Sequence, residues 1–143
     1  MHNARPTGSI GLVMVMMALT AAAAAAWNFS FQVMAATSSN VLQLTADSFY
    51  PAIHGDSLVM VQFYAPWCKL CQSLAPEYEM AASRLKISSS EVVLAKIDCV
   101  SEDPLCDAQD VKSYPTLKIY RGGQPRLYSG ELKAGAIVSF LQA

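Results

Sequence analysis

The run Leu58–Tyr64, LVMVQFY, constrains the fold more than any other stretch of this sequence. It is almost continuously apolar and has the length of a strand, a pattern typical of a β-strand that is buried on both faces. Residues 68–86 follow it with apolar side chains at helical spacing, and Pro76 inside that segment predicts a kink. A central buried strand that leads directly into a helix predicts a sheet with helices packed against it.

The rest of the chain continues this alternation of strands and helices. Thr45, followed by an acidic turn, predicts the N-cap of a helix. Further strands are predicted at Val41–Leu44, Val92–Ile97, Thr116–Tyr120 and Arg126–Ser129, the last two joined as a hairpin through RGGQP. Further helices are predicted at residues 104–110 and 132–141. The sequence therefore predicts an α/β fold with a mixed central β-sheet and helices on both faces.

Charge divides the 143 residues into two parts. Arg5 is the only charged side chain up to Ala46, whereas the rest of the chain holds the other Lys and Arg residues and all 11 Asp and Glu residues. About a hundred residues of globular composition are enough for one domain with one core. The net charge of −1, without a basic run, excludes the electrostatic pattern of a nucleic-acid binder, so no nucleic-acid partner is predicted.

Residues 1–36 are predicted to be a secretory signal peptide with a short linker, and residues 37–143 to be the folded domain. Arg5 precedes the uncharged apolar stretch Ile10–Ala26, and small-x-small cleavage patterns end at Ala26 and at Ala35. An uncleaved anchor is the alternative, but the stretch falls short of the ~20 residues that a bilayer needs. We therefore expect the domain in the endoplasmic reticulum lumen or secreted, with membrane contact only if the leader is uncleaved.

Cys68 and Cys71 stand two residues apart at the start of the helix that follows the buried strand. A thiol at a helix N-terminus faces unpaired backbone N–H groups and the positive end of the helix dipole, which stabilise the thiolate. Cys71, one turn later on the same face, is placed to attack a mixed disulfide on Cys68 and to release the partner. This spacing predicts a redox pair with Cys68 as nucleophile and Cys71 as resolving thiol, and it requires no cofactor.

Two other roles for this pair stay open at the level of residue spacing. The pair could be an inert structural disulfide or one half of a zinc site. Zinc requires four ligands, and the further candidates do not include a second C-x-x-C spacing. These candidates are Cys99, Cys106, His2 and His54. Zinc is the least favoured of the three roles, and no metal is predicted.

Four motifs carry a resemblance to a known family. In chain order they are YAPWC at residues 64–68, LAPEYE at 74–79, LAKID at 94–98 and YPTLK at 114–118. Over about residues 41–141 the chain resembles the thioredoxin-fold catalytic domain of the protein disulfide isomerase family. The resemblance implies a thioredoxin-like three-layer fold and a thiol-disulfide oxidoreductase that assists protein folding. Its implied partners are protein substrates with thiols or disulfides, and glutathione or an oxidase as redox partner.

The resemblance also implies roles for residues around the cysteine pair. Pro115 would be a cis-proline that faces the pair, where it and Tyr114 would bind an extended substrate peptide. Trp67 and Lys96 are implied to support the active site.

A second cysteine pair, Cys99 and Cys106, brackets an acidic loop after a predicted strand. The same spacing occurs in the glycoprotein-associated member of the isomerase family, which implies a disulfide that closes the loop. Such a staple contributes about 2 kcal/mol of stability in an oxidising compartment. A resolving or sensor pair is the alternative.

Departures from the family pattern predict how active this domain is. Lys69 and Leu70 stand where strongly oxidising members have Gly-His, and Gln62 stands where a buried carboxylate relays a proton from the second cysteine. Leu132 aligns with a mobile arginine that helps that cysteine to deprotonate. These changes predict an oxidoreductase that is a weaker oxidase than Cys-Gly-His-Cys members. The alternative is a low-turnover client-binding or escort module that retains thiol-bearing proteins.

Overall fold

The computed structural model describes residues 38–88 and 91–143; the predicted leader, its cleavage patterns and His2 lie outside these residues. The strands are β1 (Leu42–Gln43), β2 (Leu58–Tyr64), β3 (Val92–Asp98), β4 (Thr116–Arg121) and β5 (Gln124–Leu127). The helices are α2 (Ala46–Ile53), α3 (Lys69–Ser88), α4 (Asp103–Ala108) and α5 (Ala134–Gln142). No helix within these residues is long and apolar enough to cross a membrane.

The five strands form one sheet in the order β1-β3-β2-β4-β5, with β2 in the centre. Strand β3 runs parallel to both β1 and β2, whereas β4 runs antiparallel to β2 and β5 antiparallel to β4. The predicted mixed central sheet is therefore confirmed. The register places Gln62 of β2 beside Lys96 of β3, so these two side chains lie on the same face of the sheet.

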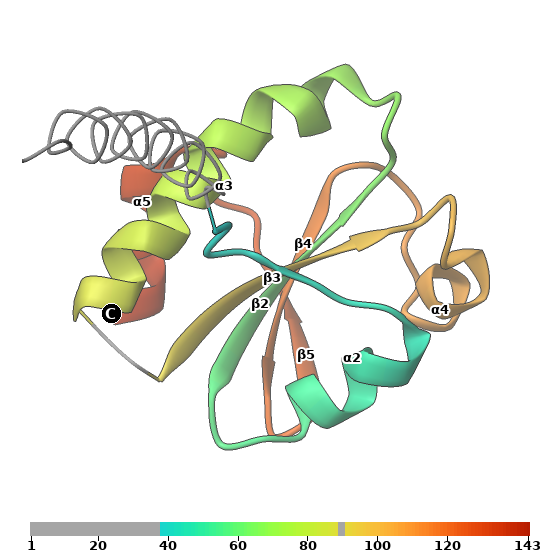
Figure 1. The fold of residues 1–143 in the computed structure, drawn as a ribbon, viewed down its shortest axis with the longest axis horizontal. Helices are drawn as coiled ribbons and strands as arrows, with labels where there is room; N and C mark the ends of the chain where they lie inside the picture. The colour runs from blue at the N-terminus through green and yellow to red at the C-terminus, as the bar shows by residue number, and fades with distance from the viewer. Residues whose placement is uncertain (1–37, 89–90) are drawn as a thin grey trace, which may run out of the picture. The chain divides into compact units, whose positions relative to one another are not determined.

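Helices cover both faces of the sheet, α3 and α5 on one side and α2 and α4 on the other (Figure 1). Side chains of β2 alternate between the two faces because the period of a strand is two residues. Met60 packs with the residues of α3 and α5, whereas Val59, Val61 and Phe63 pack with those of α2 and α4. The apolar run LVMVQFY is thus buried on both faces, as its composition predicted.

Several predicted boundaries differ from the structure, those of the hairpin, β1 and α5 among them. The hairpin connection is two residues rather than five, because Gly122 and Gly123 have φ of 54° and 79° and Arg121 already pairs with Gln124. Positive φ at both central residues is what a tight two-residue turn between antiparallel strands requires. Pro125, expected in the loop, lies in the edge strand β5, where its missing N–H is tolerated. Strand β1 is only two residues long, and α5 begins two residues later than predicted.

Helix α3 is fixed to the sheet and to α5 by two side chains. The buried Tyr78 hydroxyl lies 2.9 Å from the Met60 carbonyl oxygen and 3.0 Å from that of Ala95, so it donates toward both β2 and β3. The Glu77 carboxylate accepts the Ala134 N–H at 2.8 Å, which satisfies a free N–H in the first turn of α5. Pro76 lies inside α3 without ending it. These contacts hold the middle of α3 in place relative to the sheet and α5.

Candidate active site

Cys68 lies between the end of β2 and the first residue of α3. Its N–H donates to the Ala65 carbonyl at 3.1 Å, and its carbonyl accepts the Gln72 N–H at 3.0 Å, the first helical bond. The Cys71 N–H donates to the Cys68 sulfur at 3.2 Å. The Cys68 sulfur therefore meets a free N–H group of the helix N-terminus, an arrangement that stabilises a thiolate.

The two cysteines form a disulfide with Cα atoms 5.2 Å apart. Cys68 is 8% exposed and Cys71 is 3% exposed, so Cys68 is the more accessible residue of the pair. Both pack with Ala65 in a small cluster against which Tyr64 and Tyr114 also pack. The exposure and the helix position are those expected of an attacking Cys68 and a sheltered Cys71, although the roles themselves stay a prediction.

An exposed aromatic side chain flanks the cysteine pair. Trp67 is 68% exposed, and its ring meets that of Tyr114 edge to face with centroids 6.0 Å apart. The peptide bond between Tyr114 and Pro115 is cis. Tyr114 also packs against the cluster that contains both cysteines. Trp67, Tyr114 and Pro115, the residues implied to bind or flank a substrate, therefore lie on one surface.

The two residues between the cysteines both face solvent. Lys69 is exposed and takes part in no ion pair within residues 38–88 and 91–143. Leu70 is 54% exposed. A charge on an exposed side chain is screened by salt, so a strong electrostatic effect of Lys69 on the Cys68 sulfur is not expected.

A hollow of about 140 Å³ lies beside Cys71, lined by Gln62, Tyr64, Ala65, Pro66, Cys71, Gln72, Ala75 and Lys96. Gln62 is 3% exposed, and its amide cannot accept a proton as a carboxylate does. Burial, and then the charge of Asp98, raises the pKa of Tyr64. The residues that line this hollow therefore bring a lysine, a phenol and two amides to Cys71 but no carboxylate.

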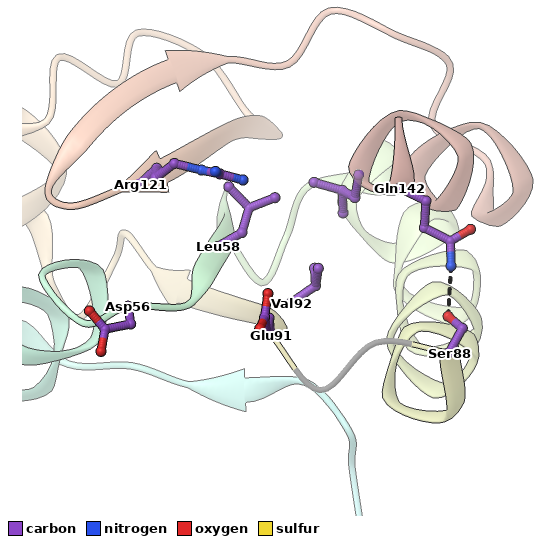
Figure 2. A pocket seen from close by; sticks show the side chains of 8 residues that line it. Asp56, Leu58, Ser88, Glu91, Val92, Arg121 and Gln142 are labelled. Atoms are coloured by element: carbon purple, nitrogen blue, oxygen red, sulfur yellow. Dashed lines mark hydrogen bonds between the residues drawn. The ribbon is translucent and has the colours of Figure 1, made fainter.

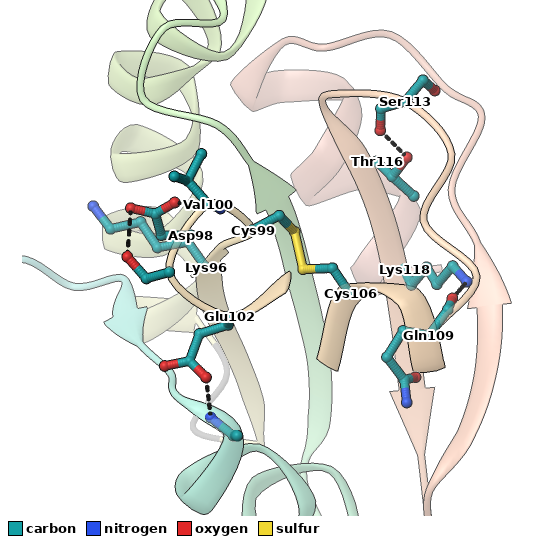
Figure 3. Close-up of a disulfide and its surroundings, with 12 residues drawn as sticks. Lys96, Asp98, Cys99, Val100, Glu102, Cys106, Gln109, Ser113, Thr116 and Lys118 are labelled. Atoms are coloured by element: carbon teal, nitrogen blue, oxygen red, sulfur yellow. Dashed lines mark hydrogen bonds between the residues drawn. A yellow bond between two sulfur atoms is a disulfide. The ribbon is translucent and has the colours of Figure 1, made fainter. Parts of the chain in front are cut away.

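The second cysteine pair is also bonded, as Figure 3 shows. Cys99 and Cys106 are each 2% exposed and connect the residue after β3 to α4. The Glu102 carboxylate accepts the Ala46 N–H at 3.0 Å and so links this loop to the start of α2. Both sulfurs belong to the core cluster on the α2 and α4 face, which favours the predicted staple over a sensor that needs solvent access.

A larger hollow, of about 420 Å³, lies where β2 and β3 begin, among residues that include Asp56, Glu91 and Arg121 (Figure 2). Because Cys68 follows the other end of β2, this hollow contains none of the predicted site residues. Within residues 38–88 and 91–143, no three His, Cys, Asp or Glu side chains are grouped as a metal site. His54, a zinc candidate, instead lies against Gly123 in the hairpin turn.

The family model described as Thioredoxin matches residues 40–143. The chain belongs to the thioredoxin family. Its thioredoxin domain is 47% identical over 107 residues to a protein disulfide-isomerase of Humicola insolens, covering 74% of this chain and 21% of that protein. It is 45% identical to protein disulfide-isomerase A4 of Bos taurus, covering 70% of this chain and 16% of that protein.

Solved structures agree with this assignment. The first thioredoxin domain of mouse protein disulfide-isomerase A4 matches with a TM-score of 0.67 and 38% identity, covering 73% of this chain and 74% of that domain. Human ERp44 matches with a TM-score of 0.70 and 27% identity, covering 74% of this chain and 29% of that chain. The predicted thioredoxin-like fold and the predicted likeness to protein disulfide isomerases are confirmed. The chain spans about a fifth of the length of the protein disulfide-isomerases that it matches.

The sequence did not reveal the hollow beside Cys71. Its walls come from β2, β3 and α3, and only packing of the three elements brings them together. One available signal was Ala75, four residues after Cys71 and therefore on the same face of the helix. A residue as small as alanine at this position leaves room beside the sulfur.

Proposed function

We propose that this thioredoxin domain is a thiol-disulfide oxidoreductase that acts on the thiols and disulfides of proteins through Cys68 and Cys71. The observation that carries the proposal is the position of the Cys68 sulfur at the start of α3, where it accepts the Cys71 N–H at 3.2 Å. Homologous protein disulfide-isomerases at 47% and 45% identity support the same activity.

The reaction follows the general course of thiol-disulfide exchange. The Cys68 thiolate attacks one sulfur of a client disulfide, a bond forms between Cys68 and that sulfur, and the other client sulfur leaves as a thiolate. The Cys71 thiolate then attacks Cys68, which forms the Cys68–Cys71 disulfide and releases the second client thiolate. Two electrons pass from the domain to the client, and the reverse sequence oxidises a client dithiol.

The surroundings of the pair support a weaker oxidase than a Cys-Gly-His-Cys domain. The Leu70 side chain has no hydrogen-bond donor and no charge with which to stabilise the Cys68 thiolate. The charge of Lys69 is on an exposed side chain. The reduced dithiol is then less stabilised, and the disulfide is harder to reduce. Gln62, buried beside Cys71, leaves the second step without a neighbouring carboxylate as proton acceptor.

The setting proposed for this chemistry is the secretory pathway. Residues 1–36 would act as the leader and residues 37–143 as the domain, with glutathione or an oxidase as redox partner and folding proteins as substrates. The buried Cys99–Cys106 disulfide supports this setting because stable disulfides form in oxidising compartments.

A second candidate function is an escort that retains clients covalently with little turnover. The observation that favours it is Gln62, because slow deprotonation of Cys71 prolongs the life of a mixed disulfide on Cys68. An escort and an enzyme share the first exchange step and differ only in release.

Turnover of a peptide disulfide in a glutathione buffer separates the two functions. The enzyme predicts many moles of reduced peptide per mole of domain and no lasting adduct on Cys68. The escort predicts about one mole of peptide per mole of domain, held as a mixed disulfide that mass spectrometry detects. Failure to exchange with either glutathione or the peptide contradicts both functions.

A further inference from the structure

A further hollow lies where α3 begins and is lined in part by Leu70, one of the two residues between the cysteines. It measures about 360 Å³ and is lined by Leu70, Ser73, Leu74, Glu131, Leu132 and Lys133. We call it the leucine hollow. Leu74 is fully buried, Leu132 packs against the core cluster and Leu70 is 54% exposed, so the three leucines extend from the core to the surface. An apolar wall with a polar rim is the usual form of a pocket for an apolar side chain.

The segment that forms one side of the leucine hollow is held in place before any ligand binds. The Tyr128 hydroxyl donates to the Glu131 carbonyl at 2.8 Å. Gly130 lies so close to the Tyr128 ring that a Cβ at this position would fall 2.5 Å from the hydroxyl oxygen. Because this segment is already ordered, a ligand does not have to supply the free energy of ordering it.

The two charges on the rim are not equivalent. Lys133 forms an ion pair with Glu77 at 3.3 Å, and Glu77 also accepts the Ala134 N–H. Glu131 is exposed, and its carboxylate has no ion-pair partner among residues 38–88 and 91–143. The rim therefore offers an incoming chain one uncompensated negative charge beside the leucines.

We propose that the leucine hollow selects clients for this domain. Its occupant is a large apolar side chain of the client, one to three residues from the client cysteine that bonds to Cys68, with a Lys or Arg neighbour facing Glu131. Leu70 is two residues after Cys68, and an extended client advances about 3.3 Å per residue, so a side chain that close to the client cysteine reaches the hollow. This inference rests on the proposed oxidoreductase function and names its substrate class.

The test measures the rate at which the reduced full chain attacks peptide–glutathione mixed disulfides. One peptide carries Leu and Arg beside its cysteine, a second carries Leu and Gln, and a third carries Ser and Gln. We expect the Leu-Arg peptide to react about tenfold faster than the Ser-Gln peptide, since filling an apolar pocket gives this order of discrimination. The Leu-Arg peptide should react about two- to fivefold faster than the Leu-Gln peptide, which is the size of effect that exposed charge pairs give.

Variants assign the selectivity to the leucine hollow. Leu132→Ser should remove most of the roughly two- to fivefold preference for Leu over Ser that the Leu-Gln and Ser-Gln peptides measure, and Glu131→Gln should remove the preference for Arg over Gln. Ile87→Ser, which removes a 90% exposed apolar side chain near the far end of α3, is the matched control and should change neither. Bis(2-hydroxyethyl) disulfide, small and uncharged, is the reference substrate, and each peptide rate is divided by the rate of the same variant with this disulfide.

Each outcome bears on a different claim. If the three peptides react at equal rates while the small disulfide exchanges normally, the leucine hollow does not select clients and the oxidoreductase function stands. If neither the small disulfide nor any peptide exchanges, the proposed function fails and this inference fails with it. Leu132 is partly buried, so thermal unfolding of Leu132→Ser is compared with that of the unmodified chain. If Leu132→Ser unfolds, the exposed-site variant Glu131→Gln tests the proposal by itself. An unchanged preference of Glu131→Gln for Arg over Gln overturns the proposal.

Discussion

Replacing Leu70 by His tests how the residues between the cysteines set the redox balance of the domain. Leu70 is the second residue of α3 and is 54% exposed, so an imidazole can replace its side chain without a change in the buried core. A histidine two residues after Cys68 adds a hydrogen-bond donor and a positive charge near a sulfur that already meets the helix N-terminus. The substitution therefore stabilises the reduced form of the pair.

The size of the effect follows from the exposure of the site. The interaction of a half-exposed charged side chain with a thiolate near a helix terminus contributes about 1 to 2 kcal/mol at most, because solvent screens it. For a two-electron couple, 30 mV corresponds to about 1.4 kcal/mol. Leu70→His should therefore raise the reduction potential of the Cys68–Cys71 pair by about 20 to 45 mV and make the domain a stronger oxidant.

The assay is equilibration of each variant with glutathione buffers of known potential, followed by alkylation and mass measurement. Gln62→Glu is the matched comparison, because it returns a carboxylate to the hollow beside Cys71 without changing the charge beside Cys68. It should speed the release step and leave the potential nearly unchanged. An unchanged potential in Leu70→His would refute the reasoning, and residues 69 and 70 would then serve recognition of clients alone.

Three further predictions concern other parts of the domain. Cys68→Ser should abolish exchange, whereas Cys71→Ser should accumulate mixed disulfides detectable by mass, since only the resolving thiol is lost. Graded reduction with peptide mapping should open Cys68–Cys71 before Cys99–Cys106, because both residues of the second pair are only 2% exposed; simultaneous opening argues against a staple. A hydrogen bond from the N–H at the start of α5, and then a neighbouring lysine, lower the pKa of Glu77. The Glu77 carboxylate therefore stabilises the fold fully above the ordinary carboxyl pKa, and this contribution is lost as the pH falls through the lowered pKa. Glu77→Gln should therefore unfold at lower urea concentration than the unmodified chain at neutral pH and equally in acid.

The fold was predictable where a long periodic pattern coincides with one element. The apolar run at Leu58–Tyr64 and the helical spacing after it define β2 and α3, because burial on both faces leaves few alternatives. Boundaries set by contacts distant in sequence were not predictable. The start of α5 depends on Glu77, which accepts the Ala134 N–H, and no local residue pattern reveals that bond.

The candidate site, like the fold, was predictable from the sequence only in part. The spacing of Cys68 and Cys71 indicates a redox pair because the chemistry depends on two thiols one helical turn apart. The leucine hollow escaped prediction because Leu70 and Leu132 are far apart in the chain and meet only when α5 packs on α3. Local sequence therefore specifies the reacting atoms, whereas tertiary packing specifies what surrounds them.

Equilibrium titration of the unmodified chain against glutathione tests the central claim most directly, with alkylation and mass measurement counting the free thiols at Cys68 and Cys71. We predict one two-electron transition in which both thiols appear together, at a potential more negative than the isomerase value near −180 mV and no lower than the thioredoxin value near −270 mV. Cys68 and Cys71 that stay bonded, or stay open, across all glutathione buffers in that range would contradict a role as a thiol-disulfide oxidoreductase.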